Sequence, residues 1–107
     1  MECLIVAVEK RETAIRDSLD VFYSELSRML EVRKKALLII WAQDDVAKRT
    51  NAVKAIWRGF GQAWREQAII MRDKRREAWE QYRTSRYECG FSGRDEEMGG
   101  FGLDSQY

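Results

Sequence analysis

Apolar side chains recur along the first forty residues in steps of four, three and four. The series runs from Leu4 to Trp41, and nine of its eleven positions are apolar; Arg11 and Arg33 are the exceptions. This spacing places its members on one side of an α-helix, and it predicts a helix over about residues 3–42. The positions are Leu4, Val8, Arg11, Ile15, Leu19, Phe22, Leu26, Leu30, Arg33, Leu37 and Trp41.

A second series with the same spacing begins at Val53, and eight of its ten positions are apolar or aromatic. It predicts a second helix over about residues 51–89. The chain has no proline, which fits two uninterrupted helices because proline breaks them. The positions are Val53, Trp57, Phe60, Trp64, Ala68, Met71, Arg75, Trp79, Tyr82 and Arg86.

The stretch "AQDDVAKRTN" between the two series has no apolar stripe. Its Asp44, Asp45, Thr50 and Asn51 are residue types that favour turns and helix N-termini, so we place a turn at about residues 43–50. The two halves then form a long antiparallel, coiled-coil-like two-helix hairpin, an all-α fold.

Two glycines, Gly59 and Gly61, leave an alternative to this turn. The first helix could extend as far as these residues and break there, or they could form a further break in a bundle of three or four shorter helices. We favour the hairpin because the second apolar series passes through both glycines without losing its spacing. Under this interpretation, the small residues let the facing helix approach closely.

The regular pattern stops at Gly90, where a glycine is expected to cap the second helix. From this residue onward the chain holds five of its seven glycines and no apolar period. We therefore predict a helical hairpin over residues 1–90 and a flexible tail over residues 91–107.

The two cysteines stand at mirrored positions, because Cys3 lies 43 residues before Val46 and Cys89 lies 43 residues after it. An antiparallel hairpin that turns near Val46 brings them side by side. We predict a disulfide, which would contribute about 4 kcal/mol in the chain-entropy model and would indicate an oxidising compartment. The alternatives are two free buried thiols or lipid attachment at Cys3.

Three stretches, "VEKRETAI", "RKKALLIIWAQDDVAKRTNAVKAIW" and "EAWEQYRTSRYECG", resemble a loose group of uncharacterised exported helical proteins of small-genome, candidate-phyla bacteria. The resemblance covers most of residues 3–90. It implies export to the periplasm, cell surface or medium together with paired cysteines, and it implies no activity. The start "MECLIVAVEK" is a poor leader, so we expect an exported protein whose leader is missing here, or a cytoplasmic protein with free thiols.

The composition offers little for catalysis. There is no histidine to act as a general base or metal ligand, and two cysteines are too few for a zinc site. The carboxylate pairs Asp44–Asp45 and Glu96–Glu97 are typical of caps and solvated charge, and no glycine-rich phosphate loop precedes a helix. No stretch reaches the ~18 apolar residues of a membrane span. We expect no enzyme, cofactor, metal site or transmembrane segment.

Basic residues are concentrated in the second half of the chain. Residues 44–89 hold eleven Lys and Arg against seven Asp and Glu, whereas residues 1–43 hold seven of each. With Trp79, Tyr82 and Tyr87 between them, these cations could bind nucleic acid or an acidic polysaccharide; the competing interpretation is a solvated face with ion pairs along the helix. The candidates are Arg72, Lys74, Arg75, Arg76, Arg83 and Arg86.

The chain carries more apolar surface than two facing helices can bury. The stretch "ALLIIWA" is apolar around its whole circumference, and further aliphatic residues lie beside the second series. Such a surplus usually marks an interface, which favours a structural or interaction protein that self-associates or binds another helical protein. The candidate residues are Leu37, Leu38, Ile39, Ile40, Trp41, Ile69 and Ile70.

Overall fold

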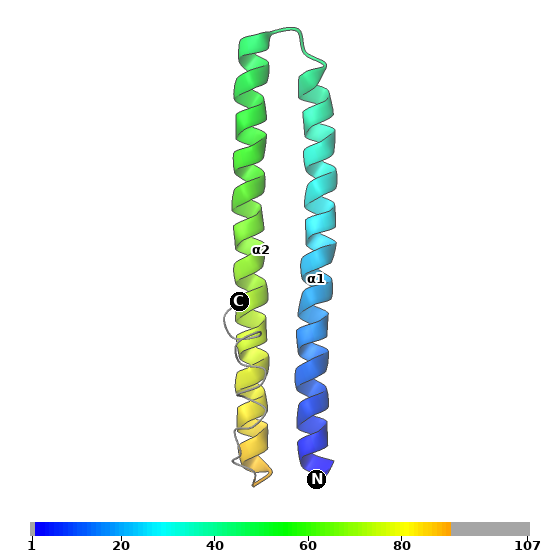
Figure 1. Cartoon of the computed structure of the whole chain (residues 1–107), viewed down its shortest axis with the longest axis vertical. Helices are drawn as coiled ribbons and strands as arrows, with labels where there is room; N and C mark the ends of the chain where they lie inside the picture. Colours follow the sequence, from blue (N-terminus) through cyan, green and yellow to red (C-terminus); the bar gives the residue numbers. More distant parts are fainter. Residues whose placement is uncertain (1, 91–107) are drawn as a thin grey trace. The chain divides into compact units, whose positions relative to one another are not determined.

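The computed structural model describes residues 2–90, and two helices account for the regular structure of this range (Figure 1). Helix α1 spans Glu2–Trp41 and helix α2 spans Val46–Glu88. The chain divides into two compact units. Of the described residues, unit 1 comprises 2–21 and 68–90, and unit 2 comprises Phe22–Gln67.

Within each unit, a segment of α1 lies beside a segment of α2 that runs in the opposite direction (Figure 1). Unit 2 contains the connection between the helices, and unit 1 contains the Cys3–Cys89 disulfide, whose Cα atoms are 5.8 Å apart. The predicted all-α antiparallel hairpin and the predicted cysteine pairing are therefore confirmed. The predicted tail, residues 91–107, lies outside the described residues.

The connection between the helices is shorter than predicted, because α2 begins at Val46, five residues early. The carboxylate of Asp45 accepts a hydrogen bond of 3.1 Å from the backbone N–H of Lys48. This is the N-cap interaction that satisfies a free donor in the first turn of a helix. Thr50, which we expected in the turn, lies inside α2, where its hydroxyl donates to the Val46 carbonyl.

Both candidate helix breaks, Gly59 and Gly61, lie inside the uninterrupted α2. The alternatives of a break at these glycines and of three or four shorter helices are therefore wrong for residues 2–90. Our interpretation of the glycines is also wrong, because a Cβ atom added at either position would meet nothing within 4 Å. A cost of about 1 kcal/mol each is offset by contacts of the neighbouring turns with α1, namely those of Phe60 with Arg33 and of Trp64 with Phe22.

The C-terminal end of α2 agrees with the prediction. Gly90 has a φ of 79°, a left-handed conformation that glycine adopts without a steric penalty. Its N–H donates a 2.9 Å hydrogen bond to the carbonyl of Tyr87, and the N–H of Cys89 donates to Ser85. Gly90 thus caps the helix immediately after the disulfide.

Burial differs between the two units. Unit 1 has a core to which both helices contribute, whereas in unit 2 the buried apolar residues Phe22, Leu26 and Met29 all belong to α1. No residue of α2 within unit 2 is buried. The core of unit 1 consists of Ala7, Ile15, Ala78, Trp79 and Tyr82, with Leu4, Val8 and Leu19 packed against it.

Candidate interaction surfaces

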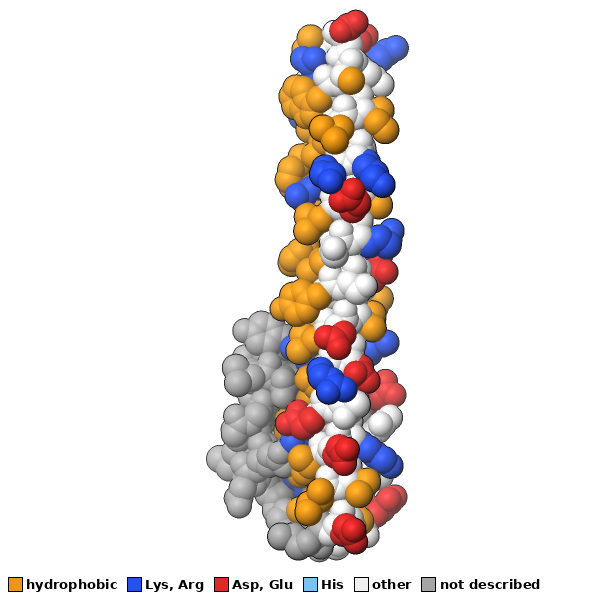
Figure 2. All heavy atoms as spheres, turned by 90° about the vertical axis from the view of Figure 1, so that its right-hand side faces the viewer, with side chains coloured by type: hydrophobic (Ala, Val, Ile, Leu, Met, Phe, Trp, Pro, Cys, Tyr) orange, Lys and Arg blue, Asp and Glu red, His pale blue; other side chains and the backbone are white. Residues whose placement is uncertain are grey.

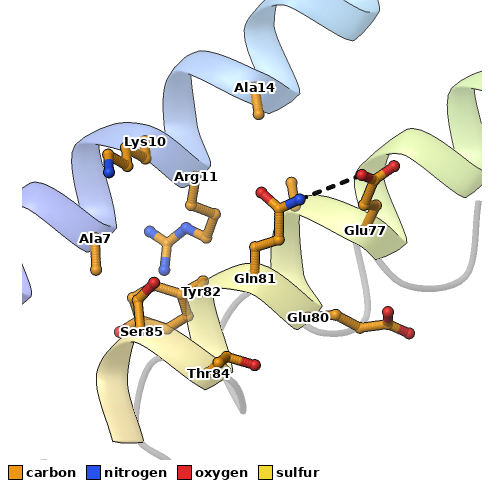
Figure 3. A pocket seen from close by; sticks show the side chains of 11 residues that line it. Ala7, Lys10, Arg11, Ala14, Glu77, Glu80, Gln81, Tyr82, Thr84 and Ser85 are labelled. Atoms are coloured by element: carbon orange, nitrogen blue, oxygen red, sulfur yellow. Dashed lines mark hydrogen bonds between the residues drawn. The ribbon is translucent and has the colours of Figure 1, made fainter. Parts of the chain in front are cut away.

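The first polar member of the α1 series, Arg11, is buried against aromatic rings in unit 1. Its guanidinium carbon lies 4.5 Å from the ring centroid of Trp79 and 4.4 Å from that of Tyr82. Figure 3 shows the side chain reaching from α1 toward Tyr82. The negative faces of the rings attract the cation, and Nη2 also donates to Glu12 at 3.2 Å. An arginine can therefore occupy an interior position of this helix pair.

The second polar member, Arg33, makes the same arrangement in unit 2. Its guanidinium carbon lies 4.3 Å from the Trp57 ring centroid and 4.4 Å from the Phe60 centroid. The two arginines are 22 residues apart, and so are their Trp-x-x-aromatic partners. We call each set an arginine clamp. Helical spacing alone did not predict either clamp. A turn near Val46 nevertheless places each of the two arginines opposite a Trp-x-x-aromatic motif of the second series.

A cleft of about 530 Å³ opens beside the Arg11 clamp in unit 1 (Figure 3). Among its lining residues, Gln81 donates a 3.2 Å hydrogen bond to Glu77 on the same helix. Lys10 and Glu80 add exposed charges of opposite sign, and the chain has no imidazole to activate the Ser85 hydroxyl. Small-molecule sites are predominantly apolar, so we assign no ligand to this charged cleft.

A different groove, of about 320 Å³, lies between the helices of unit 2. Three of the five α2 residues that line it are small, and its α1 side combines two arginines with Met29, Val32 and Ala36. Such a groove can accept apolar side chains from a neighbouring helix. Its lining consists of Arg28, Met29, Val32, Arg33, Ala36, Ala55, Ile56, Gly59, Phe60 and Ala63.

Unit 2 also exposes many large apolar side chains. In Figure 2, hydrophobic side chains follow one edge of this unit in a nearly continuous band, and charged side chains are scattered over the rest of the face shown. Several members of the α1 and α2 series are among them. Trp64, for example, contacts the buried Phe22 with one edge, at 6.0 Å between ring centroids, and still exposes 43% of its surface. The exposed residues are Tyr23, Leu30, Val32, Leu38, Ile39, Trp41, Val46, Trp57 and Trp64.

The residues predicted for self-association are divided between the units. Unit 2 contains the five from Leu37 to Trp41, of which Leu37 and Ile40 are half-buried and the others exposed. Ile69 and Ile70 are exposed as well, but they belong to unit 1. Only the first group belongs to the same unit as the exposed apolar residues named above.

The residues predicted for polyanion binding all lie in unit 1. Arg75 and Arg86 are only 7% and 9% exposed, and the Arg86 guanidinium lies 5.6 Å from the ring centroid of Tyr82. These two arginines occupy positions of the α2 series and face the interior. The remaining four are at least partly exposed: Arg72, Lys74, Arg76 and Arg83.

The surplus of basic charge belongs to unit 2. This unit holds nine Lys and Arg against five Asp and Glu, whereas residues 2–21 and 68–90 of unit 1 hold nine of each. Unit 2 therefore combines exposed apolar side chains with a net positive charge.

Comparison with protein-family models, with curated proteins and with solved structures finds no match. In the part of the chain that the structure describes, metal-ligating side chains do not gather in groups of three or more. Neither α1 nor α2 contains a stretch that is apolar enough to cross a membrane. The exposed apolar surface and the groove of unit 2 are the features on which a function can be argued.

Proposed function

We propose that the protein is a non-catalytic interaction protein that self-associates through unit 2. The observation that carries this proposal is the incomplete burial within the unit: α2 has no fully buried side chain there, and nine large apolar residues of the unit are exposed. At about 200 Å² per aromatic side chain, the four exposed rings alone leave roughly 400 Å² in water. This is already the scale of the largest apolar patch on a typical monomer, about 300–600 Å².

A second copy of the chain is the partner that this surface fits. The groove has small residues at Ala36, Gly59 and Ala63, and the same unit carries bulky side chains that project from its surface. Together with the exposed aliphatic residues, the rings supply apolar area on the scale of the ~800 Å² per partner that a stable interface buries. Covering it is favourable by about 25 cal/mol per Å².

The proposal includes export from the cytoplasm. The Cys3–Cys89 disulfide supports it, because such bonds persist in oxidising compartments. An exported interaction protein gains from this bond, since closing a loop of 86 residues restricts the unfolded chain and stabilises the fold by about 4 kcal/mol.

Size-exclusion chromatography with light scattering on the oxidised protein tests the self-association. We expect a molar mass above that of the monomer, rising with protein concentration. Gly59→Leu places a bulky side chain at the groove, at a position where a Cβ atom meets nothing within 4 Å, and we expect it to fill the groove without separating the helices. This variant should be monomeric with unchanged helical content by circular dichroism.

The matched control is Gln62→Leu, which adds the same side chain to an exposed position of α2 that does not line the groove. It should keep the wild-type mass. A wild-type protein that stays monomeric at every concentration would rule out self-association, and an unchanged mass for Gly59→Leu would rule out the groove as its site.

A further inference from the structure

The turn end of unit 2 has an apolar surface that is distinct from the groove. Leu38 and Ile39 are each 65% exposed, Trp41 is 59% exposed and Val46 is 61% exposed. The first three belong to the last turn of α1, and Val46 is the first residue of α2. We call these four side chains the apex; none of them lines the groove.

Basic side chains surround the apex. Lys34, Lys35 and Lys48 are exposed and lie within eight residues of the connection between the helices, and Lys34 also makes a surface ion pair of 3.2 Å with Glu31. Of the two acids in this connection, Asp45 accepts a hydrogen bond from the backbone N–H of Lys48, so the N-terminus of α2 partly neutralises it. Asp44 remains exposed, and the apex region keeps a net positive charge.

The turn itself is braced by contacts that leave the apex exposed. The guanidinium of Arg49 lies 5.0 Å from the ring centroid of Trp41, and its Nη1 donates a 3.3 Å hydrogen bond to the carbonyl of Gln43. Arg49 thus contacts one face of the Trp41 ring, and Trp41 still exposes more than half of its surface. A braced ring with exposed aliphatic neighbours can enter an apolar medium without first refolding the turn.

We propose that the apex binds the surface of a membrane that contains anionic lipids. The aliphatic side chains and Trp41 enter the boundary between headgroups and acyl chains, where tryptophan is favoured. The lysines contact lipid phosphates, and each contributes about a fivefold gain in affinity. This binding leaves the groove free, but it uses four of the nine exposed residues that the self-association proposal counts, so lipid and a second copy would compete for the apex.

Charge and shape favour a lipid surface over the other partners. Two apices in contact would bring the exposed Lys34, Lys35 and Lys48 of one copy close to those of the other, and like charges repel. The apex side chains project at a chain reversal and do not form a groove, so they suit a planar partner that can deform around them. A negatively charged lipid surface meets both requirements.

Vesicle sedimentation tests this proposal with the full-length, oxidised protein. We expect binding to phosphatidylcholine vesicles that contain phosphatidylglycerol, little binding to phosphatidylcholine alone, and weaker binding as salt screens the lysines. The double variant Leu38→Ser/Ile39→Ser should lose at least tenfold in partition, because two aliphatic side chains no longer enter the lipid.

A matched control is Ile69→Ser/Ile70→Ser, which changes two adjacent exposed aliphatic residues of unit 1. It should partition like the wild type, and circular dichroism should show equal helical content in both double variants. A third variant, Lys34→Gln/Lys35→Gln/Lys48→Gln, should lose about fivefold for each lysine removed.

Three results would overturn the proposal. These are equal partition onto neutral and anionic vesicles, equal losses in the two double variants, and binding to heparin, DNA or polyglutamate without any binding to vesicles. The last result would assign the basic surface to a soluble polyanion or an acidic protein. Added salt distinguishes this inference from self-association. It should weaken lipid binding, because it screens the lysines, and it should strengthen self-association, because it lessens the repulsion between copies.

Discussion

At the scale of single residues, an arginine can take an inward position of an apolar helix series when aromatic rings lie opposite it. Arg33 lies over two rings of α2 in unit 2, and Arg11 does the same in unit 1. The planar guanidinium stacks on aromatic faces and loses less hydration than an ammonium group would. The sequence predicted that both positions face the partner helix. It did not predict the ring contacts, because helical periodicity treats an arginine as an interruption of the stripe.

Replacing Arg33 with alanine should lower the free energy of unfolding by about 1–2 kcal/mol, because the contacts with Trp57 and Phe60 are lost. Urea denaturation followed by circular dichroism in dilute solution measures this change. Lys34→Ala is the control, since this neighbouring side chain makes only a surface ion pair with Glu31, worth at most about 1 kcal/mol. Equal losses in the two variants would show that the clamp contributes nothing specific.

At the scale of the helices, the extent of each element was predictable to within a few residues except at the start of α2. Two long series of apolar residues and an absence of proline leave little choice but helix. The start of α2 was misplaced because Asp44, Asp45, Thr50 and Asn51 are all acceptable caps, and local sequence does not rank them. The hydrogen bond from Lys48 N–H to Asp45 settles which one begins the helix.

Glycine-to-alanine substitutions should have opposite effects at two positions of the second helix. Gly59→Ala should raise the free energy of unfolding by about 0.5–1 kcal/mol, because alanine is the better helix former and its Cβ meets nothing. Gly90→Ala should lower it by about 1–2 kcal/mol, because φ is 79° there and L-residues avoid this conformation.

Thermal and urea unfolding of the two variants in dilute solution, where self-association is minimal, measures both changes. If Gly59→Ala destabilises the protein, the added Cβ atom must clash in solution with a group outside the helix pair. If Gly90→Ala has no effect, the left-handed cap is not needed to end the helix.

At the scale of the whole molecule, the two units differ in how they use similar sequence patterns. The apolar series continue with the same spacing through both units, yet Trp57 and Trp64 are exposed in unit 2 while Trp79 and Tyr82 are buried in unit 1. The sequence predicted the apolar surplus. Its concentration in unit 2 was not predictable, because periodicity identifies the inward side of a helix and says nothing of how completely the facing residues cover it.

Amide hydrogen exchange at increasing protein concentration tests the central claim, that unit 2 is the surface through which copies of the chain associate. The account predicts that exchange slows with concentration in residues 22–67, because covering the exposed face opposes local opening of the helices. Exchange in residues 4–21 and 68–88 should stay constant. Rates that are independent of concentration throughout the chain, or protection confined to unit 1, would contradict it.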